Sequence, residues 1–154
     1  MLRKAETKDI SRIAEILIFT KRVTYRPIFK NDHVSFNVMQ VLNEIERLKK
    51  PHEMDNLYVW DDGIVKAMIT MKTEPDKVWL TDFYVDTFFQ NEGVGSKILE
   101  TIFEQNKGKE IHANPLDQNV RAVKYYEKKG FVYTGNKEEF LDSGFYMLDY
   151  CYKN

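Results

Sequence analysis

Residues 78–105 read VWLTDFYVDTFFQNEGVGSKILETIFEQ, and the pattern of this stretch decides the fold. Val78–Val85 is rich in β-branched and aromatic residues, which predicts a strand. Asp86–Glu92 is predicted to be a loop, and Gly93-Val94-Gly95 leads from that loop into a helix. Apolar residues recur in the helix at a spacing of three and four, so we expect one buried face made of Ile98, Leu99, Ile102 and Phe103.

A strand that passes through a glycine-rich turn into a helix is a favourable site for an anion. The N–H groups of the first helical turn have no acceptor within the helix, and the helix dipole is positive at that end. Glycine has no Cβ, so a phosphate can come close to the backbone. The sequence therefore predicts a phosphate-bearing ligand at Gly93–Gly95.

Two common phosphate-binding patterns do not fit this loop. The P-loop needs Gly-Lys-Ser/Thr, whereas the order here is Gly95-Ser96-Lys97. The dinucleotide fingerprint needs a small residue where Ile98 stands and a glycine directly after the strand. The sequence therefore argues against a nucleotide-binding module, although an ordinary glycine turn before a core helix also fits the loop taken alone.

Two motifs together resemble a known family. Gln90-Asn91-Glu92-Gly93-Val94-Gly95 resembles the Q/R-x-x-G-x-G/A pyrophosphate loop of the GCN5-related N-acetyltransferases (the GNAT superfamily), which are acyl-CoA-dependent enzymes. Residues 119–131, NVRAVKYYEKKGF, resemble the second GNAT signature, N-x-x-A-x-x-x-Y-x-K-x-G-F. Independently of the family, Asn119 is a helix N-cap type and Gly130 suits a helix C-terminus. The resemblance covers the chain from about Leu2 to its end.

The expected elements follow the order β-α-α-β-β-β-α-β-α-β-β, which is also the GNAT order. We expect an α/β (α+β) fold with a mixed, mostly antiparallel sheet of roughly six to seven strands, flanked by about four helices. Lys21–Val34 contains Pro27 and is predicted to be irregular, and Ser35 is predicted to cap a helix that ends at Lys50. The other expected boundaries are a strand over 2–6, a helix capped by Thr7, a hairpin of 57–60 and 64–71, strands over 110–113, 131–134 and 145–152, and a connection over 135–144.

Composition excludes several classes of protein. The chain has 154 residues, 43% hydrophobic and 31% charged, so we expect one globular domain over residues 1–154. The net charge of −1 gives no basic field, so neither nucleic acid nor a membrane is expected as a partner. Neither a signal peptide nor a run of about 18 apolar residues is found, which predicts a cytoplasmic protein. A single cysteine, Cys151, excludes an internal disulfide, and no metal is expected because His33, His52 and His112 lack ligand spacing.

The resemblance implies acetyl-CoA as cosubstrate. It implies that backbone groups of 83–85 contact the pantetheine arm and that the N–H groups of 91–96 bind the pyrophosphate. Asn119 is implied to contact the pantetheine or the pyrophosphate side. The full set of expected cofactor contacts is Phe83, Tyr84, Val85, Gln90, Asn91, Glu92, Gly93, Val94, Gly95, Ser96, Lys97, Asn119, Ala122 and Tyr125.

The family reaction is direct attack of an amine on the thioester, and it needs a proton donor for the leaving thiolate. Tyr126 matches the tyrosine of the second signature. A phenol with a pKa of about 10 can protonate a thiolate whose pKa is about 8.5. Adjacent helical residues face about 100° apart, so only one of Tyr125 and Tyr126 can point at the cosubstrate. Tyr126 also fits a core aromatic residue.

The attacking ammonium must also lose a proton. Spermidine/spermine N-acetyltransferases resemble this strand and carry an acidic pair where Thr81-Asp82 stands here, so their usual glutamate base is replaced by Thr81. Asp82 is a weak base unless burial or a water assists it. Asp82 fits three roles: a base, a ligand of the cationic acceptor, or a structural carboxylate.

The acceptor is expected to be a primary amine of a small molecule or peptide. In GNAT folds the segment that joins the first two helices borders the acceptor pocket, so Tyr25, Arg26 and Phe29 are candidates for substrate binding, although these aromatics also fit a sealed core. A non-catalytic CoA-binding regulatory domain is the alternative function, because Thr81 replaces the glutamate. Relatives are often dimers, so a homodimer is expected by analogy.

Overall fold

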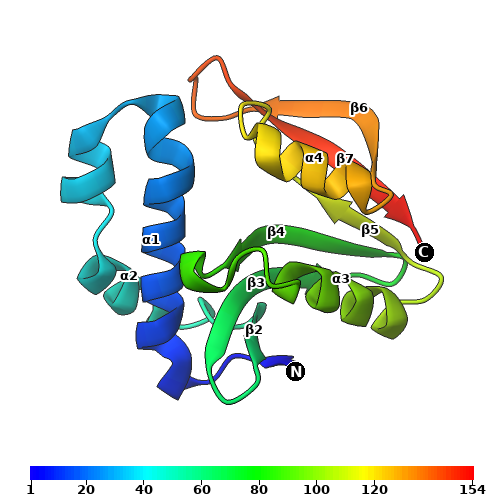
Figure 1. Ribbon diagram of the computed structural model, residues 1–154, viewed down its shortest axis with the longest axis horizontal. Coiled ribbons are helices and arrows are strands. Elements are labelled where there is room, and N and C mark those ends of the chain that lie inside the picture. Colours follow the sequence, from blue (N-terminus) through cyan, green and yellow to red (C-terminus); the bar gives the residue numbers. More distant parts are fainter. The chain divides into compact units, whose positions relative to one another are not determined.

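The computed structural model describes all residues from Met1 to Asn154 (Figure 1). The chain divides into two compact units, the first made of Met1–Met71 with Asp82–Ile102 and the second of Lys72–Thr81 with Phe103–Asn154. The strands hydrogen-bond in the order β1-β2-β3-β4-β5-β7-β6. β4 and β5 pair in parallel, whereas β1–β2, β2–β3, β5–β7 and β6–β7 are antiparallel. The predicted element order and the mixed, mostly antiparallel sheet are confirmed.

The first unit is built on the long helix α1, Ile10–Phe29. Its apolar stripe of Ile10, Ile13, Ala14 and Leu17 is buried and packs in one core cluster with residues of β2, Leu57–Asp61, and β3, Val65–Thr73. α2, Val41–Leu48, packs beside α1 and adds Leu48 to this cluster (Figure 1). β1, Leu2–Lys4, pairs with β2, and the predicted β2–β3 hairpin is confirmed. None of the helices is both long enough and apolar enough to span a membrane.

Two predicted boundaries of α1 are wrong. The helix begins at Ile10 rather than at Thr7, because a 3₁₀ turn over Thr7–Asp9 comes first. Lys21–Val34 is not irregular, since α1 continues to Phe29 and Pro27 lies inside its last turn. A proline removes its own bond to the carbonyl four residues earlier and crowds that carbonyl, but only two helical residues follow Pro27, so the disturbance is confined to the end of α1. Lys30 ends α1 in a left-handed conformation with φ of 50°.

The predicted cap at Ser35 is also wrong. Residues Val34–Val38 form a π-helical turn, and α2 begins only after Gln40. Arg22 holds this segment on α1, since its Nε donates to the Ser35 carbonyl at 2.9 Å and its Nη2 to the Met39 carbonyl at 2.8 Å. A side chain from another helix therefore fixes this connection, and local helix signals do not report such a contact.

The decisive stretch folds as predicted. β4 is Lys77–Val85, a short 3₁₀ turn follows at Thr87–Phe89, and α3 is Val94–Gln105. Within the first unit, the α3 residues Ile98, Leu99 and Ile102 are at most 1% exposed. The predicted buried face of α3 is therefore confirmed for these three residues.

The second unit contains β5, Glu110–Ala113, and α4, Val120–Lys128, together with the last two strands (Figure 1). The predicted N-cap of α4 is confirmed, because Asn119 Oδ1 accepts from the Ala122 N–H at 3.3 Å. Gly130 ends this segment with φ of 91°, as its predicted place at the helix C-terminus requires.

β6, Val132–Glu139, is longer than the predicted strand over 131–134, and β7 is Tyr146–Lys153. Gly135 was expected to begin a connection, but it lies within β6 with φ of 90°. The pairing register shifts between Tyr133 and Lys137, so a bulge at the glycine absorbs the irregularity and the strand continues. The rings of Phe103, Phe131 and Tyr152 pack together in the second unit.

Candidate active site

The predicted phosphate loop has the backbone of an anion site. Asn91 and Gly93 take left-handed conformations, with φ of 66° and 79°. The Lys97 N–H donates to the Gly93 carbonyl at 3.1 Å, so no carbonyl of α3 can accept from the three N–H groups before it, those of 94–96. A Cβ added to Gly93 would meet no atom within 4 Å. The loop thus offers first-turn amides beside open space, which fits the diphosphate of coenzyme A.

Two side chains fix the residues that lead into this loop. Asp86 is buried, and its carboxylate accepts from the Phe88 N–H at 2.8 Å. Gln90 Nε2 donates to the Val85 carbonyl at 3.0 Å. Both contacts hold residues 86–90 in a defined conformation after β4, and these residues lead into the loop.

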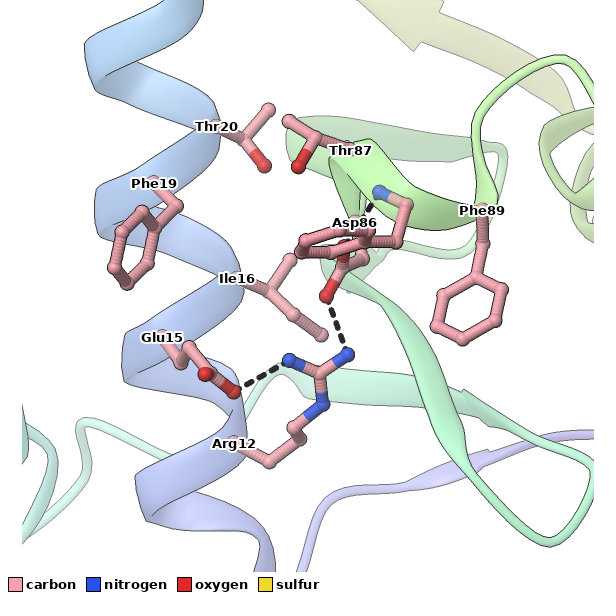
Figure 2. A pocket seen from close by; sticks show the side chains of 9 residues that line it. Arg12, Glu15, Ile16, Phe19, Thr20, Asp86, Thr87 and Phe89 are labelled. Atoms are coloured by element: carbon pink, nitrogen blue, oxygen red, sulfur yellow. Dashed lines mark hydrogen bonds and ion pairs between the residues drawn. The ribbon is translucent and has the colours of Figure 1, made fainter.

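Arg12 anchors the same segment from α1 and was not found from the sequence. Its guanidinium forms an ion pair with Asp86 and another with Glu15 at 2.5 Å, and its Nε donates to the Val65 carbonyl at 3.1 Å (Figure 2). Burial disfavours the charged guanidinium, but the bonds with Glu15 and Asp86 outweigh burial and raise the pKa of Arg12. Arg12 and Asp86 are far apart in the sequence, so no local pattern joins them.

A pocket of about 210 Å³ lies between α1 and this segment (Figure 2). Its charged groups are already paired with one another, because Arg12 binds both Glu15 and Asp86. The rest of its wall is largely apolar, and it contains none of the residues predicted for the site. The lining residues are Arg12, Glu15, Ile16, Phe19, Thr20, Asp86, Thr87, Phe88 and Phe89.

Within the first unit the structure brings together two predicted site residues, Tyr25 and Asp82. The Tyr25 and Tyr84 hydroxyls lie 3.3 Å apart, and Thr70 Oγ1 donates to the Asp82 carboxylate at 3.2 Å. Burial raises the pKa of Tyr25, the bond with Tyr84 opposes the shift, and the charge of Asp82 adds to it. Two phenols near a carboxylate form a suitable surface for an ammonium group.

The two other predicted acceptor residues differ from each other. Phe29 packs its ring against that of Tyr25 with centroids 6.1 Å apart, so it belongs to the same cluster. Arg26 is exposed, and it forms an ion pair with Asp32 at 2.7 Å. Its guanidinium therefore has a partner at the surface of α1.

The second unit holds the residues of the second signature. Tyr126 is 8% exposed, and its ring makes edge contacts with Tyr125 at 5.4 Å and Phe131 at 5.2 Å between centroids. Asn119 and Ala122 meet at the cap of α4. The sequence is compatible with two roles for Tyr126, a general acid and a core residue. The ring contacts fix the position of its side chain.

His112 is a buried histidine of β5 with a charged partner. Its Nδ1 lies 2.8 Å from Asp149 Oδ1, and its ring stacks on Trp79 at 4.4 Å between centroids. His112 is 6% exposed, so it is a core histidine of β5 and not a surface residue.

Comparison with known proteins identifies the family. A family profile described as "Acetyltransferase (GNAT) domain" matches residues 53–133, which is more than half of the chain. The chain therefore belongs to the GNAT acetyltransferases, as its two motifs predicted. It is an acetyltransferase, and acetyl-CoA is its cosubstrate.

A curated relative and two solved structures are similar to the chain. The spermine/spermidine N(1)-acetyltransferase of Bacillus subtilis (strain 168) is 29% identical over 119 residues, which are 67% of this chain and 78% of that protein. An N-acetyltransferase from Staphylococcus aureus Mu50 has a TM-score of 0.72 at 15% identity, covering 99% of this chain and 100% of that one. PaiA N-acetyltransferase from Thermoplasma acidophilum, solved with coenzyme A, has a TM-score of 0.67 at 20% identity, covering 99% and 98%. The two structures confirm the fold.

Proposed function

We propose that the chain transfers the acetyl group of acetyl-CoA to a primary amine of a small cationic molecule, of which polyamines are the first class to test. The observation that carries the proposal is the cluster of Asp82 with the hydroxyls of Tyr25 and Tyr84 in the first unit. A carboxylate attracts an ammonium, and aromatic faces bind cations. The name of the Bacillus subtilis relative, a spermine/spermidine acetyltransferase, supports the same class.

In this proposal the amides of 91–96 hold the diphosphate of the cosubstrate. The left-handed turn at Gly93 and the open space beside it support this role. Backbone groups of 83–85, together with residues Gln90, Asn119 and Tyr125, are assigned to the remaining length of the cosubstrate by resemblance. Acetyl-CoA supplies an acetyl group bound to a thiolate that is a good leaving group, and the chain orients this cosubstrate.

Tyr126 is proposed as the general acid. A tyrosine with an ordinary pKa of about 10 is protonated at neutral pH and therefore carries a proton to give. Transfer to a thiolate whose thiol has a pKa of about 8.5 is uphill by about 2 kcal/mol, so it takes place together with cleavage of the C–S bond. Its contacts with Tyr125 and Phe131 hold the ring in one place, as a positioned acid requires. The proton returns from solvent after the products leave.

Asp82 is proposed to bind the ammonium of the acceptor and to accept its proton, directly or through a water. A carboxylate is a weak base at neutral pH, so binding is the larger part of this role. The Thr70 hydroxyl donates to Asp82 and orients it. Thr81 is exposed and carries no carboxylate, so it cannot share the task.

A substitution at Asp82 tests the acceptor site. We expect Asp82→Asn to raise KM for the amine by at least about 10-fold while KM for acetyl-CoA stays within about 2-fold, because only the amine loses its counter-charge. Asp76→Asn, in the exposed turn before β4, is the matched control and leaves both constants unchanged. Equal changes in the two Michaelis constants of Asp82→Asn contradict the assignment.

An amine panel tests the substrate class. Thiol release is measured with spermidine, spermine, a monoamine, a permethylated polyamine and a lysine peptide, all at equal concentration. We expect release with the polyamines and none with the permethylated analogue, which has no N–H to acylate. Turnover of the lysine peptide alone would move the acceptor to the peptide class.

A further inference from the structure

Three side chains with different metal-binding atoms meet in the second unit, and the proposed reaction uses none of them. Glu110 and His112 are two residues apart on β5, so both point to the same face of the strand. Cys151 on β7 is the direct cross-strand partner of His112. The sequence does not show this cluster, because Cys151 lies far from both residues along the chain and only the strand register joins them.

The separations suit a tetrahedral ion. One ligand atom from each of Glu110, His112 and Cys151 lies within 4.8 Å of the others. Bonds of about 2.1 Å to nitrogen or oxygen and about 2.3 Å to sulfur place the ligands of a tetrahedral zinc ion about 3.4 to 3.6 Å apart. His112 Nε2 and Glu110 Oε2 are 3.4 Å apart already. The Glu110 side chain is 41% exposed, so a rotation about its side-chain bonds that moves the carboxylate by about 1 Å can bring it to the ion.

The histidine is oriented for this role by a second carboxylate. His112 Nδ1 lies 2.8 Å from Asp149 Oδ1, and Asp149 Oδ2 accepts from Thr134 Oγ1 at 2.9 Å. A donor hydrogen on Nδ1 leaves the lone pair of Nε2 directed at Glu110, and the stacked ring of Trp79 keeps the imidazole plane in place. A carboxylate behind a metal-bound histidine is the usual outer partner of zinc ligands.

We propose that Glu110, His112 and Cys151 form a binding site for one divalent transition-metal ion, zinc by preference. Calcium and magnesium are disfavoured because they select sites made of oxygen ligands. The sulfur, imidazole and carboxylate together suit zinc, whose fourth position is filled by water. The two anionic ligands, the Cys151 thiolate and the Glu110 carboxylate, balance the charge of the dication, and Asp149 adds one further negative charge behind His112. The ion links β5 to β7, so it stabilises the folded chain by an amount that grows with the logarithm of its free concentration above the Kd.

Metal titration of the full-length, untagged and reduced chain tests this site. Zinc is titrated by calorimetry into protein that has been dialysed against a chelator, and cobalt is titrated in parallel while absorption is recorded. We expect one ion per chain. We also expect the cobalt complex to show a thiolate-to-metal charge-transfer band together with the intense visible bands of a tetrahedral ion, because Cys151 is the only thiol.

Matched variants identify the ligands. We expect Cys151→Ser and His112→Gln each to weaken zinc binding by more than about 100-fold, and Asp149→Asn to weaken it by about 10- to 100-fold. His52→Gln is the control, since His52 also pairs with an aspartate, Asp55, but its side chain is exposed and has no thiol beside it. It should leave affinity and the cobalt spectrum unchanged.

Three results overturn the site. The first is a wild-type chain that does not bind stoichiometric zinc at micromolar concentration. The second is a cobalt complex without the thiolate band, and the third is a loss of zinc affinity in His52→Gln. If Cys151→Ser does not fold, Glu110→Gln replaces it, because this half-exposed side chain can be changed without a cavity. Unchanged affinity in that variant counts against the site, and the wild-type cobalt spectrum reports the thiolate independently.

Discussion

The guanidinium of Arg12 on α1 forms an ion pair with the carboxylate of Asp86, the residue that follows β4 (Figure 2). The Asp86 side chain is 7% exposed and that of Arg12 is 28% exposed, so water screens the pair only from one side. Asp86 also accepts from the Phe88 N–H and thereby shapes the turn that leads to the phosphate loop. Helix α1 therefore fixes the start of the loop to which we assign cosubstrate binding.

Loss of this ion pair is expected to destabilise the fold. Arg12→Gln leaves the Asp86 carboxylate buried without its cation, so we expect the free energy of unfolding to fall by about 2 kcal/mol, less than for a fully buried pair. Urea denaturation followed by circular dichroism measures the change. Arg26→Gln is the control, because its ion pair with Asp32 is at the surface and should contribute little. Similar losses in both variants contradict the role given to Arg12.

The phosphate loop can be tested at its central glycine. Gly93→Val should abolish acetyl-CoA binding in calorimetry, because a branched side chain would occupy the space assigned to the diphosphate. Gly108→Val is the matched control for backbone strain, because Gly108 has a positive φ of 82° and open space beside it, as Gly93 does. We expect the control to lose stability and keep its affinity. Unchanged affinity in Gly93→Val would reduce the loop to an ordinary turn.

The general acid is tested by removing one hydroxyl. Tyr126→Phe keeps the ring contacts with Tyr125 and Phe131, so the fold should be preserved. We expect kcat to fall by about 100-fold and the Kd of acetyl-CoA to stay within about 2-fold, because the proton is needed only as the thiolate leaves. Tyr133→Phe is the control, because Tyr133 is an exposed tyrosine of β6 outside the proposed site, and it should keep most of the activity. Wild-type kcat in Tyr126→Phe removes the assignment.

Acid stability is tested at Asp9. Its carboxylate accepts two hydrogen bonds from Arg3, at 2.7 and 2.9 Å, and one from the Glu6 N–H at 2.8 Å. The bonds with Arg3 lower the pKa of Asp9 most, burial opposes them, and the Glu6 N–H lowers it further. Because the folded pKa lies below the unfolded value of about 3.9, this contribution is present above about pH 4 and is lost as the pH falls through the folded pKa.

The difference in unfolding free energy between the wild type and Asp9→Asn should therefore be larger at pH 6 than at pH 3. Urea denaturation at both values measures it. In an Arg3→Gln background the same substitution should lose most of this pH dependence, since the cation that lowers the pKa is gone. A difference that does not change with pH refutes the coupling.

The sequence correctly predicted those helices whose signals lie within one short stretch of the chain. The spacing of Ile98, Leu99 and Ile102 reported one buried helix face, and Asn119 with Gly130 marked both ends of α4. The pattern was misleading at Pro27, because a proline in the last turn of a helix costs one hydrogen bond and does not break it. It was also misleading at Gly135, where a bulge lets β6 continue.

The site was predictable only in part for the same reason. Motifs named the loop at Gly93 and the phenol of Tyr126, since family signatures are contiguous in the sequence. The pairs Arg12–Asp86 and Tyr25–Tyr84 join residues from distant segments, and the packing of α1 decides them. No spacing rule along a single chain reports which distant side chains will share one face.

Acetyl transfer to a polyamine is the central claim and can be measured directly. Purified chain is incubated with acetyl-CoA and spermidine, released thiol is followed continuously, and the amine product is identified by mass spectrometry. The account predicts thiol release that saturates in both substrates, with one acetylated spermidine formed for each thiol. Release that is the same with and without any amine of the panel, and no acetylated product, would contradict it.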